Sequence, residues 1–283
     1  MDIGVGLPNG MLGADRRGIV DWARRAEEAG FSSLGTIDRL AYPAFEPLTT
    51  LAAAAAVTER IGLVTDILLG PLRSNNALFA KQAATVDQLS EGRLTLGLGV
   101  GLREDDFEAA GVDYHKRGAL FERQLEDLMR FWAGEGRVGP EPWNGERPAM
   151  LIGGGADVAY ERAAKYADGW TLGGGPPEAF TQGLAKMKDA WSAAGRDGDP
   201  RAMAMVYFAL GDGAKEIAHK NFGDYYGFLG EFAQNVVDSA ALDADALRSS
   251  LTAFEQAGAD EVLFFPASTD PDQVELLAEA VGL

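Results

Sequence analysis

Two glycine triplets each lie between an apolar run and the start of a segment with helical periodicity. They are Gly153-Gly154-Gly155 and Gly173-Gly174-Gly175. Glycine lets backbone N–H groups approach an anion closely, and the N-terminal end of a helix adds a favourable dipole. We therefore predict a phosphate cradle at these loops, although tight turns alone would also use such glycines. The predicted contacts are Gly153, Gly154, Gly155, Ala156, Gly173 and Gly174.

Polar side chains at two other apolar runs are candidates for ligand contact. Asp38 follows the run Leu34–Ile37, and Thr65 and Asp66 interrupt the run Ile61–Leu69. A polar group inside an apolar strand needs a hydrogen-bond partner or a ligand, because its burial is otherwise costly. We expect Thr65 and Asp66 to contact a ligand. Asp38 either does the same or caps the loop that follows it.

Arg39 follows Asp38 directly and is the candidate catalytic residue. Its guanidinium stays protonated at neutral pH, so it cannot act as a general acid or base. It can instead stabilise a developing negative charge or bind an anionic substrate. A salt bridge to a neighbouring carboxylate is the alternative.

The residue types that are missing exclude several kinds of active site. The sequence has no cysteine and only two histidines, His115 and His219, so we expect no thiolate or multi-histidine metal site. The lysines lie in predicted helices and loops rather than in strands, which disfavours a Schiff base. The segment Gly97–Leu102 lacks the third glycine of the dinucleotide-binding fingerprint. A pair of glycosidase carboxylates stays open, without diagnostic spacing.

A repeated pattern of strand and helix must position these candidates. Apolar runs rich in Val, Ile and Leu alternate with amphipathic segments, which is typical of parallel strands buried on both faces. Eight strands, each followed by a helix, predict a (β/α)8 TIM barrel with its ligand site at the carboxyl ends of the strands. The runs are Ile3–Leu7, Leu34–Ile37, Ile61–Leu69, Leu94–Val100, Ala149–Ile152, Trp170–Leu172, Met203–Leu210 and Val262–Phe265.

The helices and the domain organisation follow from the same pattern. We expect one domain over residues 1–283, with insertions near 101–148 and 211–260, because neither long connection has the composition of a linker. The expected helices are Asp15–Ala29, Pro47–Glu59, Asn75–Ser90, Lys116–Trp132, Asp157–Ala167, Pro177–Ala194 and one that begins near Asp270.

Composition limits the partners. The formal net charge of −18 opposes the phosphate contacts that nucleic-acid binding requires. The sequence contains no run of about 20 apolar residues and no recognisable export signal, so we expect a cytoplasmic protein without a membrane partner.

Six stretches of the sequence resemble the bacterial-luciferase-like family of flavin-dependent oxidoreductases and monooxygenases. They are Pro71–Arg73, Ala80–Arg93, Leu96–Gly101, Arg103–Glu108, Gly111–Gly118 and Ala167–Trp170. The resemblance covers nearly the whole chain and implies a luciferase-like TIM barrel. It also implies reduced FMN, or its deazaflavin analogue coenzyme F420, at the carboxyl-end face.

The resemblance implies roles for individual residues of this sequence. It implies an unusual backbone geometry between Val64 and Asp66, which is a cis peptide in many relatives. The implied cofactor contacts are Asp38 and Thr65 at the ring, Val100 and Gly101 in the next loop, and Gly154, Gly155 and Ala156 at the phosphate.

Two departures from the family pattern narrow the reaction. Deazaflavin-dependent dehydrogenases of this family carry a histidine where this chain has Arg39, and a glutamate where it has Leu102. Two candidate reactions remain, which are oxygen activation and hydride transfer to an activated double bond. The main hypothesis is therefore an FMN-dependent monooxygenase that acts on a small organic substrate, with a separate flavin reductase as a further partner and a homo-oligomeric state.

Three alternatives stay open. One is a coenzyme F420-dependent oxidoreductase of the same family. The second is a flavin-binding protein without catalytic activity, because fold does not fix function. The third is a barrel enzyme whose glycine loops bind the phosphate of a metabolite.

Overall fold

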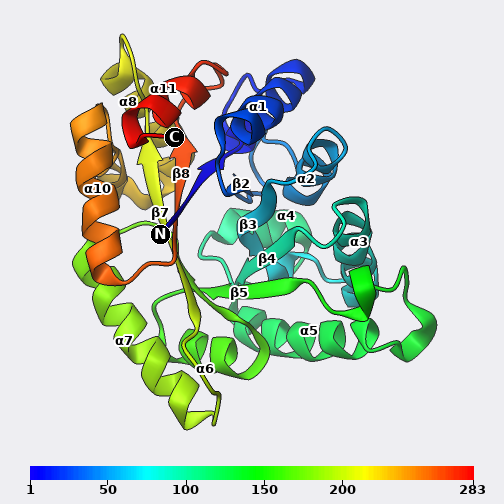
Figure 1. Ribbon diagram of the computed structural model, residues 1–283. Coiled ribbons are helices and arrows are strands. Elements are labelled where there is room, and N and C mark those ends of the chain that lie inside the picture. The colour runs from blue at the N-terminus through cyan, green and yellow to red at the C-terminus, as the bar shows by residue number, and fades with distance from the viewer.

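The computed structural model closes eight parallel strands into a barrel, which confirms the predicted (β/α)8 fold (Figure 1). The strands follow one another around the barrel in chain order, and β8 pairs with β1. The structure describes the backbone of residues 1–283 and all side chains except those of Leu229, Glu231 and Phe232. The strands are β1 (Asp2–Gly6), β2 (Ser33–Thr36), β3 (Gly62–Leu69), β4 (Leu94–Gly99), β5 (Ala149–Gly153), β6 (Gly169–Leu172), β7 (Arg201–Phe208) and β8 (Glu261–Pro266).

Helices surround the strands as an outer ring (Figure 1). They are α1 (Arg16–Ala29), α2 (Pro47–Ala55), α3 (Asn76–Leu89), α4 (Glu104–Ala110), α5 (Arg117–Trp132), α6 (Asp157–Tyr166), α7 (Pro177–Ala193), α8 (Ala214–Tyr226), α9 (Ala233–Asp238), α10 (Ala244–Ala257) and α11 (Gln273–Val281). Among the described residues, no helix is both long enough and apolar enough to cross a membrane. The segment 101–148 contains α4 and α5, and the segment 211–260 contains α8, α9 and α10.

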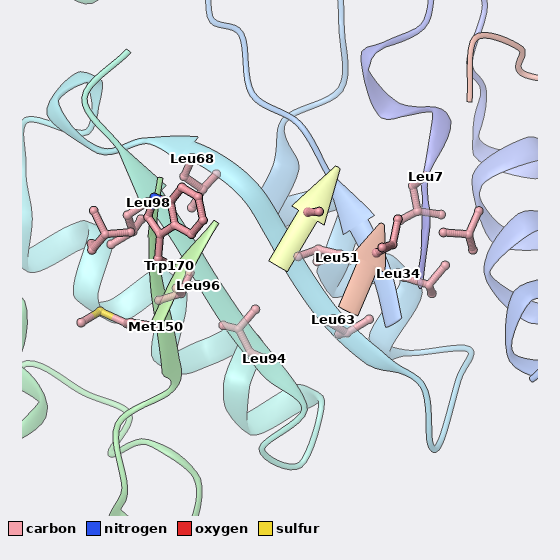
Figure 2. Close-up of a cluster of buried hydrophobic side chains, with 14 of the residues drawn as sticks. Leu7, Leu34, Leu51, Leu63, Leu68, Leu94, Leu96, Leu98, Met150 and Trp170 are labelled. Atoms are coloured by element: carbon pink, nitrogen blue, oxygen red, sulfur yellow. The ribbon is translucent and has the colours of Figure 1, made fainter. Parts of the chain in front are cut away.

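The core has two layers, because side chains along a strand alternate between its two faces. On β8, Val262 and Phe264 pack against the helices, whereas Leu263 and Phe265 point into the barrel. Figure 2 shows the outer layer, where strand residues such as Leu96 and Trp170 meet the helices. The inner layer continues into α8 through buried aromatic side chains, so this inserted helix packs over the barrel interior.

Candidate active site

A cavity of about 420 Å³ opens at the carboxyl ends of the strands. This volume lies in the range of small-molecule sites. Among the predicted site residues, those in its wall are Asp38, Asp66, Val100, Gly101, Gly153, Gly154, Gly173 and Gly174. The predicted residues outside the wall are Arg39, Thr65, Gly155 and Ala156.

Four larger hollows lie away from the carboxyl ends of the strands. Three of them, of about 630, 480 and 760 Å³, adjoin the start of α1, the helices α6 and α7, and the helices α3 and α5, and none is lined by a residue of a barrel strand. The fourth, of about 570 Å³, is lined by one strand residue, Ala149, which lies at the amino end of β5. The cavity at the carboxyl ends is therefore the candidate active site.

A bulge in β3 shapes the base of this cavity. The pairing of β3 with β4 shifts register between Thr65 and Leu68, and the bond Asp66–Ile67 is cis. The predicted position of the unusual bond, between Val64 and Asp66, is therefore wrong by one residue. Asp66 and Ile67 lie within this irregular stretch of β3, and both form part of the cavity wall.

Glycines on β4 make room for the bulge. A Cβ atom at Gly97 would overlap the Thr65 carbonyl oxygen, and one at Gly99 would overlap the Ile67 side chain. The overlap at Gly97 is with backbone, so it cannot be relieved without moving a strand, whereas at Gly99 the end of the Ile67 side chain would have to shift. Gly97 and Gly99, which do not belong to a dinucleotide-binding fingerprint, thus allow β4 to pack closely against β3. Thr65 is fully buried and donates a hydrogen bond to the Gly97 carbonyl at 2.9 Å, so it belongs to this framework rather than to the cavity wall.

Asp66 is a buried carboxyl group in the cavity wall, with 4% of its surface exposed. Oδ1 accepts a hydrogen bond from Thr171 Oγ1 at 2.8 Å. Oδ2 has no hydrogen-bond partner among the described residues. Burial is the main cause that raises the pKa of Asp66 to about 7; the Thr171 hydrogen bond lowers it, and the Glu261 carboxylate raises it further.

Asp38 has protein partners for its carboxylate. Oδ2 accepts hydrogen bonds from the Leu69 N–H at 2.9 Å and from Arg73 Nη1 at 2.6 Å. These contacts tie the end of β2 to the end of β3, as expected for a residue that fixes the following loop. Asp38 still forms part of the cavity wall.

The two glycine loops lie at the start of helices that no described side chain caps. The first residues of α6 and α7 follow Ala156 and Pro176, neither of which caps its helix by a side-chain hydrogen bond. Gly154 has φ +130°, a conformation that strains any other residue. Its carbonyl accepts a hydrogen bond of 2.8 Å from Nε1 of the buried Trp170, which holds the loop in place. Uncapped N–H groups at a helix start are suited to an anion.

Arg39 lies beside the cavity but is engaged by carboxylates. Its side chain is only 6% exposed, and Nη2 contacts Asp105 Oδ2 at 2.6 Å. Nε lies 3.6 Å from Oδ2 of the fully buried Asp106, whose other oxygen accepts the Leu40 and Ala41 N–H groups. Arg39 thus adopts the salt-bridge geometry that was the alternative to catalysis. Its catalytic role stays a prediction.

Sequence reasoning missed Arg103 as a site residue. Arg103 lines the cavity, and its guanidinium lies 4.6 Å from the ring centre of Tyr225 and 4.3 Å from that of Phe228. No carboxylate among the described side chains lies within 4 Å of it. The signal was its place in the acidic motif that follows the fourth strand, where it could not be told from a surface arginine.

Aromatic side chains form the opposite wall of the cavity. They are Tyr207 on β7, Tyr225 and Tyr226 on α8, and Phe228. The hydroxyl groups of Tyr207 and Tyr226 contact each other, and burial raises the pKa of both Tyr207 and Tyr225 well above the usual range for phenols. These tyrosines are therefore neutral and can present hydroxyl groups to a ligand. The sequence left open whether this aromatic segment lines a site or only packs the inserted helices.

Both histidines lie outside the site. His115 and His219 are exposed, on the 3-10 turn before α5 and on α8 respectively. In the part of the chain whose side chains are described, no cluster of three or more histidines and carboxylates has the arrangement of a metal site.

Comparison with known proteins supports one family. The family model described as "Luciferase-like monooxygenase" matches residues 1–273. An uncharacterised protein of Mycobacterium tuberculosis is 30% identical over 237 residues, which cover 71% of this chain and 81% of that protein. A second uncharacterised protein of the same organism is 30% identical over 173 residues, or 56% of this chain and 61% of that protein, so the match spans less than two thirds of that relative.

Solved structures share the fold at low sequence identity. The monooxygenase RslO1 from Streptomyces bottropensis has a TM-score of 0.79 at 24% identity, covering 99% of this chain and 98% of that one. An F420-dependent secondary alcohol dehydrogenase has a TM-score of 0.81 at 17% identity, covering 99% of both chains. The oxygenating constituent of 3,6-diketocamphane monooxygenase from Pseudomonas putida, in complex with FMN, has a TM-score of 0.75 at 18% identity, covering 99% of this chain and 96% of that one. On the match over residues 1–273, this chain belongs to the luciferase-like monooxygenase family.

Proposed function

We propose that this protein binds reduced FMN in the cavity at the carboxyl ends of the strands and uses it to oxygenate a small organic substrate. The single observation that carries the proposal is the composition of this one cavity. Glycine loops at uncapped helix starts form one side of it, and neutral aromatic side chains form the other. A ligand with a phosphate at one end and a flat apolar ring system at the other fits such walls.

The residues fit this cofactor as follows. The N–H groups of Gly153 and Gly154, and those of the loop at Gly173 and Gly174, would hold the phosphate. The bulge at Asp66 and Ile67 would support the ring, and the aromatic wall would exclude water from it. The flavin supplies the electron transfer and the reaction with oxygen, whereas the protein supplies orientation and a dry environment. A separate flavin reductase is the proposed source of electrons.

Coenzyme F420 is the alternative cofactor, and one observation disfavours its use in an alcohol dehydrogenase. Arg39, which stands in place of the histidine, is held in ion pairs by Asp105 and Asp106. Leu102, in place of the glutamate, is apolar and 67% exposed. The two positions therefore offer no proton donor or acceptor for alcohol oxidation. Reduction of an activated double bond by reduced F420 stays compatible with these residues.

A cofactor titration tests the proposal. Purified protein is titrated with FMN and separately with coenzyme F420, with quenching of cofactor fluorescence as the signal. Saturable binding of FMN supports the proposal, and exclusive binding of F420 would favour the alternative. If neither cofactor binds, the phosphorylated-metabolite hypothesis gains support instead.

A second measurement distinguishes an oxygenase from a flavin-binding protein. FMN is reduced chemically under nitrogen, mixed with the protein and then exposed to oxygen, and its reoxidation is followed by absorbance. We expect the protein to change the rate of reoxidation relative to free reduced FMN. An unchanged rate with protein-bound flavin would indicate binding without oxygen activation.

A further inference from the structure

We propose that Asp66 keeps a proton on Oδ2 up to near neutral pH, where an ordinary aspartate has lost it, and donates it to an acceptor atom of the group bound in the cavity. The proposal rests on the proposed function for the identity of that group, a flavin. The protonated state itself is a property of this chain and can be measured without a ligand. It gives a specific chemical role to a residue that was expected only to touch the ligand.

The position of Asp66 supports a role toward a ligand. The residue lies in the bulge of β3 and forms part of the cavity wall together with its neighbour Ile67. Oδ1 is occupied by the Thr171 hydroxyl at 2.8 Å, whereas Oδ2 has no partner among the described residues. A buried polar atom without a partner is rare, and one in a cavity wall points to a ligand that completes its hydrogen bonding.

The charges around Asp66 favour the neutral acid. Glu261 on β8 is a carboxylate inside the barrel and acts against a second negative charge. Tyr226 on α8 is a partly buried phenol with a raised pKa, so it adds no charge. Arg39 is directed at Asp105, and Arg103 is directed at aromatic rings. No arginine or lysine among the described side chains lies within 4 Å of the Asp66 carboxyl. Burial without a compensating cation raises the pKa of Asp66 to about 7.

A neutral carboxyl at this place can hold or move one proton. It can donate a hydrogen bond from Oδ2 to a ring nitrogen or a carbonyl oxygen, which a carboxylate cannot do. When the proton is transferred, the Oδ2–H bond breaks and a bond forms between the proton and the acceptor atom. The negative charge left on Asp66 is then stabilised by the Thr171 hydrogen bond at Oδ1. After the bound group leaves the cavity, solvent returns the proton to Oδ2.

The first test measures the proton on Asp66 in the protein without ligand. Aspartate labelled with ¹³C in the carboxyl group is followed by NMR over a pH titration, and Asp66→Asn identifies the Asp66 signal. We expect a titration near neutral pH in the wild type, and one at higher pH in Thr171→Val, which lacks the hydrogen bond to the carboxylate. An Asp66 carboxyl that titrates with the ordinary value of an aspartate would overturn the proposal, whether or not FMN binds.

The second test measures FMN affinity between about pH 5 and about pH 9, a range that spans this titration. We expect wild-type affinity to fall about tenfold as pH rises through the pKa of Asp66, because the hydrogen-bond donor is lost. Asp66→Asn keeps a donor at all pH values, so its affinity should stay constant. Thr171→Val should move the fall to higher pH.

A matched control separates the effect of the Asp66 proton on FMN affinity from a general effect of removing a buried carboxyl group. Asp87 is also buried, with a pKa raised mainly by burial, but lies away from the cavity and accepts the Trp143 N–H. Asp87→Asn should keep the wild-type pH profile. If the wild type and Asp66→Asn bind FMN with the same pH dependence, the Asp66 proposal fails while the cofactor proposal stands. If the wild type binds neither FMN nor coenzyme F420 at any pH, the cofactor proposal fails, and the NMR titration alone decides the state of Asp66.

Discussion

The Asp66 carboxyl on β3 accepts a hydrogen bond from the Thr171 hydroxyl on β6, at 2.8 Å across the mouth of the barrel. Two other strands, β4 and β5, separate β3 and β6 around the barrel. The contact therefore spans the interior and places a partly satisfied acid between the two halves of the cavity wall.

Asp66→Asn should change the pH dependence of stability. The folded-state pKa of Asp66, about 7, lies above that of an unfolded aspartate, so the native state binds more protons between about pH 4 and about pH 7. The contribution of Asp66 to stability is complete below about pH 4 and is lost as pH rises to about 7. We expect Asp66→Asn to raise the free energy of unfolding by about 2 to 4 kcal/mol at pH 8 and to have little effect at pH 4. Urea titrations at both pH values test this, and an equal effect at the two values would contradict it.

Gly97→Ala should disrupt the bulge of β3. The added Cβ atom would overlap the Thr65 carbonyl oxygen, and we expect a loss of about 3 kcal/mol in the free energy of unfolding. Gly223→Ala is the control, because its added Cβ atom would meet no atom within 4 Å beyond its chain neighbours and the nearby backbone of its own helix, and alanine is favoured in α8. Urea titrations measure both variants. Equal stability of Gly97→Ala and wild type would show that the two strands do not approach as described.

Trp170→Phe should weaken FMN binding by loosening the first glycine loop. The change removes the indole N–H that holds the Gly154 carbonyl, and we expect about tenfold lower affinity. Trp191→Phe is the matched control, because it loses a similar hydrogen bond, to the Asp197 carbonyl, outside the cavity. Both variants should lose stability, but only Trp170→Phe should lose affinity in a fluorescence titration. A similar loss of affinity in both would attribute the effect to general destabilisation.

Arg39→Ala should lower the free energy of unfolding. Removing the guanidinium leaves the buried Asp106 without its neighbouring cation, at a cost of about 2 to 3 kcal/mol. Arg39→Lys should recover only part of the loss, since a point charge replaces a planar fork. Arg103→Ala should cost about 1 kcal/mol, because Arg103 contacts aromatic rings rather than described carboxylates. Wild-type stability of Arg39→Ala in urea, together with lost turnover once a substrate is known, would restore the catalytic prediction.

The strand pattern was predictable because parallel strands buried on both faces leave a strong apolar signal. The predicted run Met203–Leu210 corresponds to β7 at Arg201–Phe208, a shift of two residues. Boundaries depend on the register with neighbouring strands, which no local pattern contains. The unusual bond that was expected between Val64 and Asp66 lies one bond further on, at Asp66–Ile67, within the register shift between β3 and β4, which likewise depends on the neighbouring strand.

The site was predictable where backbone conformation or strand ends define it, as at Gly154 and Asp66. The site was not predictable where a side chain could pair with any of several neighbouring residues. Arg39 and Arg103 are both arginines beside acidic residues in the sequence, yet Arg39 pairs with Asp105 and Arg103 faces the cavity. That choice depends on how the inserted helix α8 packs over the barrel, a contact between distant parts of the chain.

The central claim is that a flavin phosphate binds at the Gly154 loop, and a titration of matched glycine variants tests it most directly. Gly154→Ala adds a Cβ atom at a position with φ +130°, in the wall of the cavity. Gly195→Ala adds one at an exposed position with φ +71°, away from the cavity, so it also carries backbone strain. We expect wild type and Gly195→Ala to bind FMN with equal affinity and Gly154→Ala to bind at least about tenfold more weakly. Equal FMN affinity of all three proteins would contradict the claim.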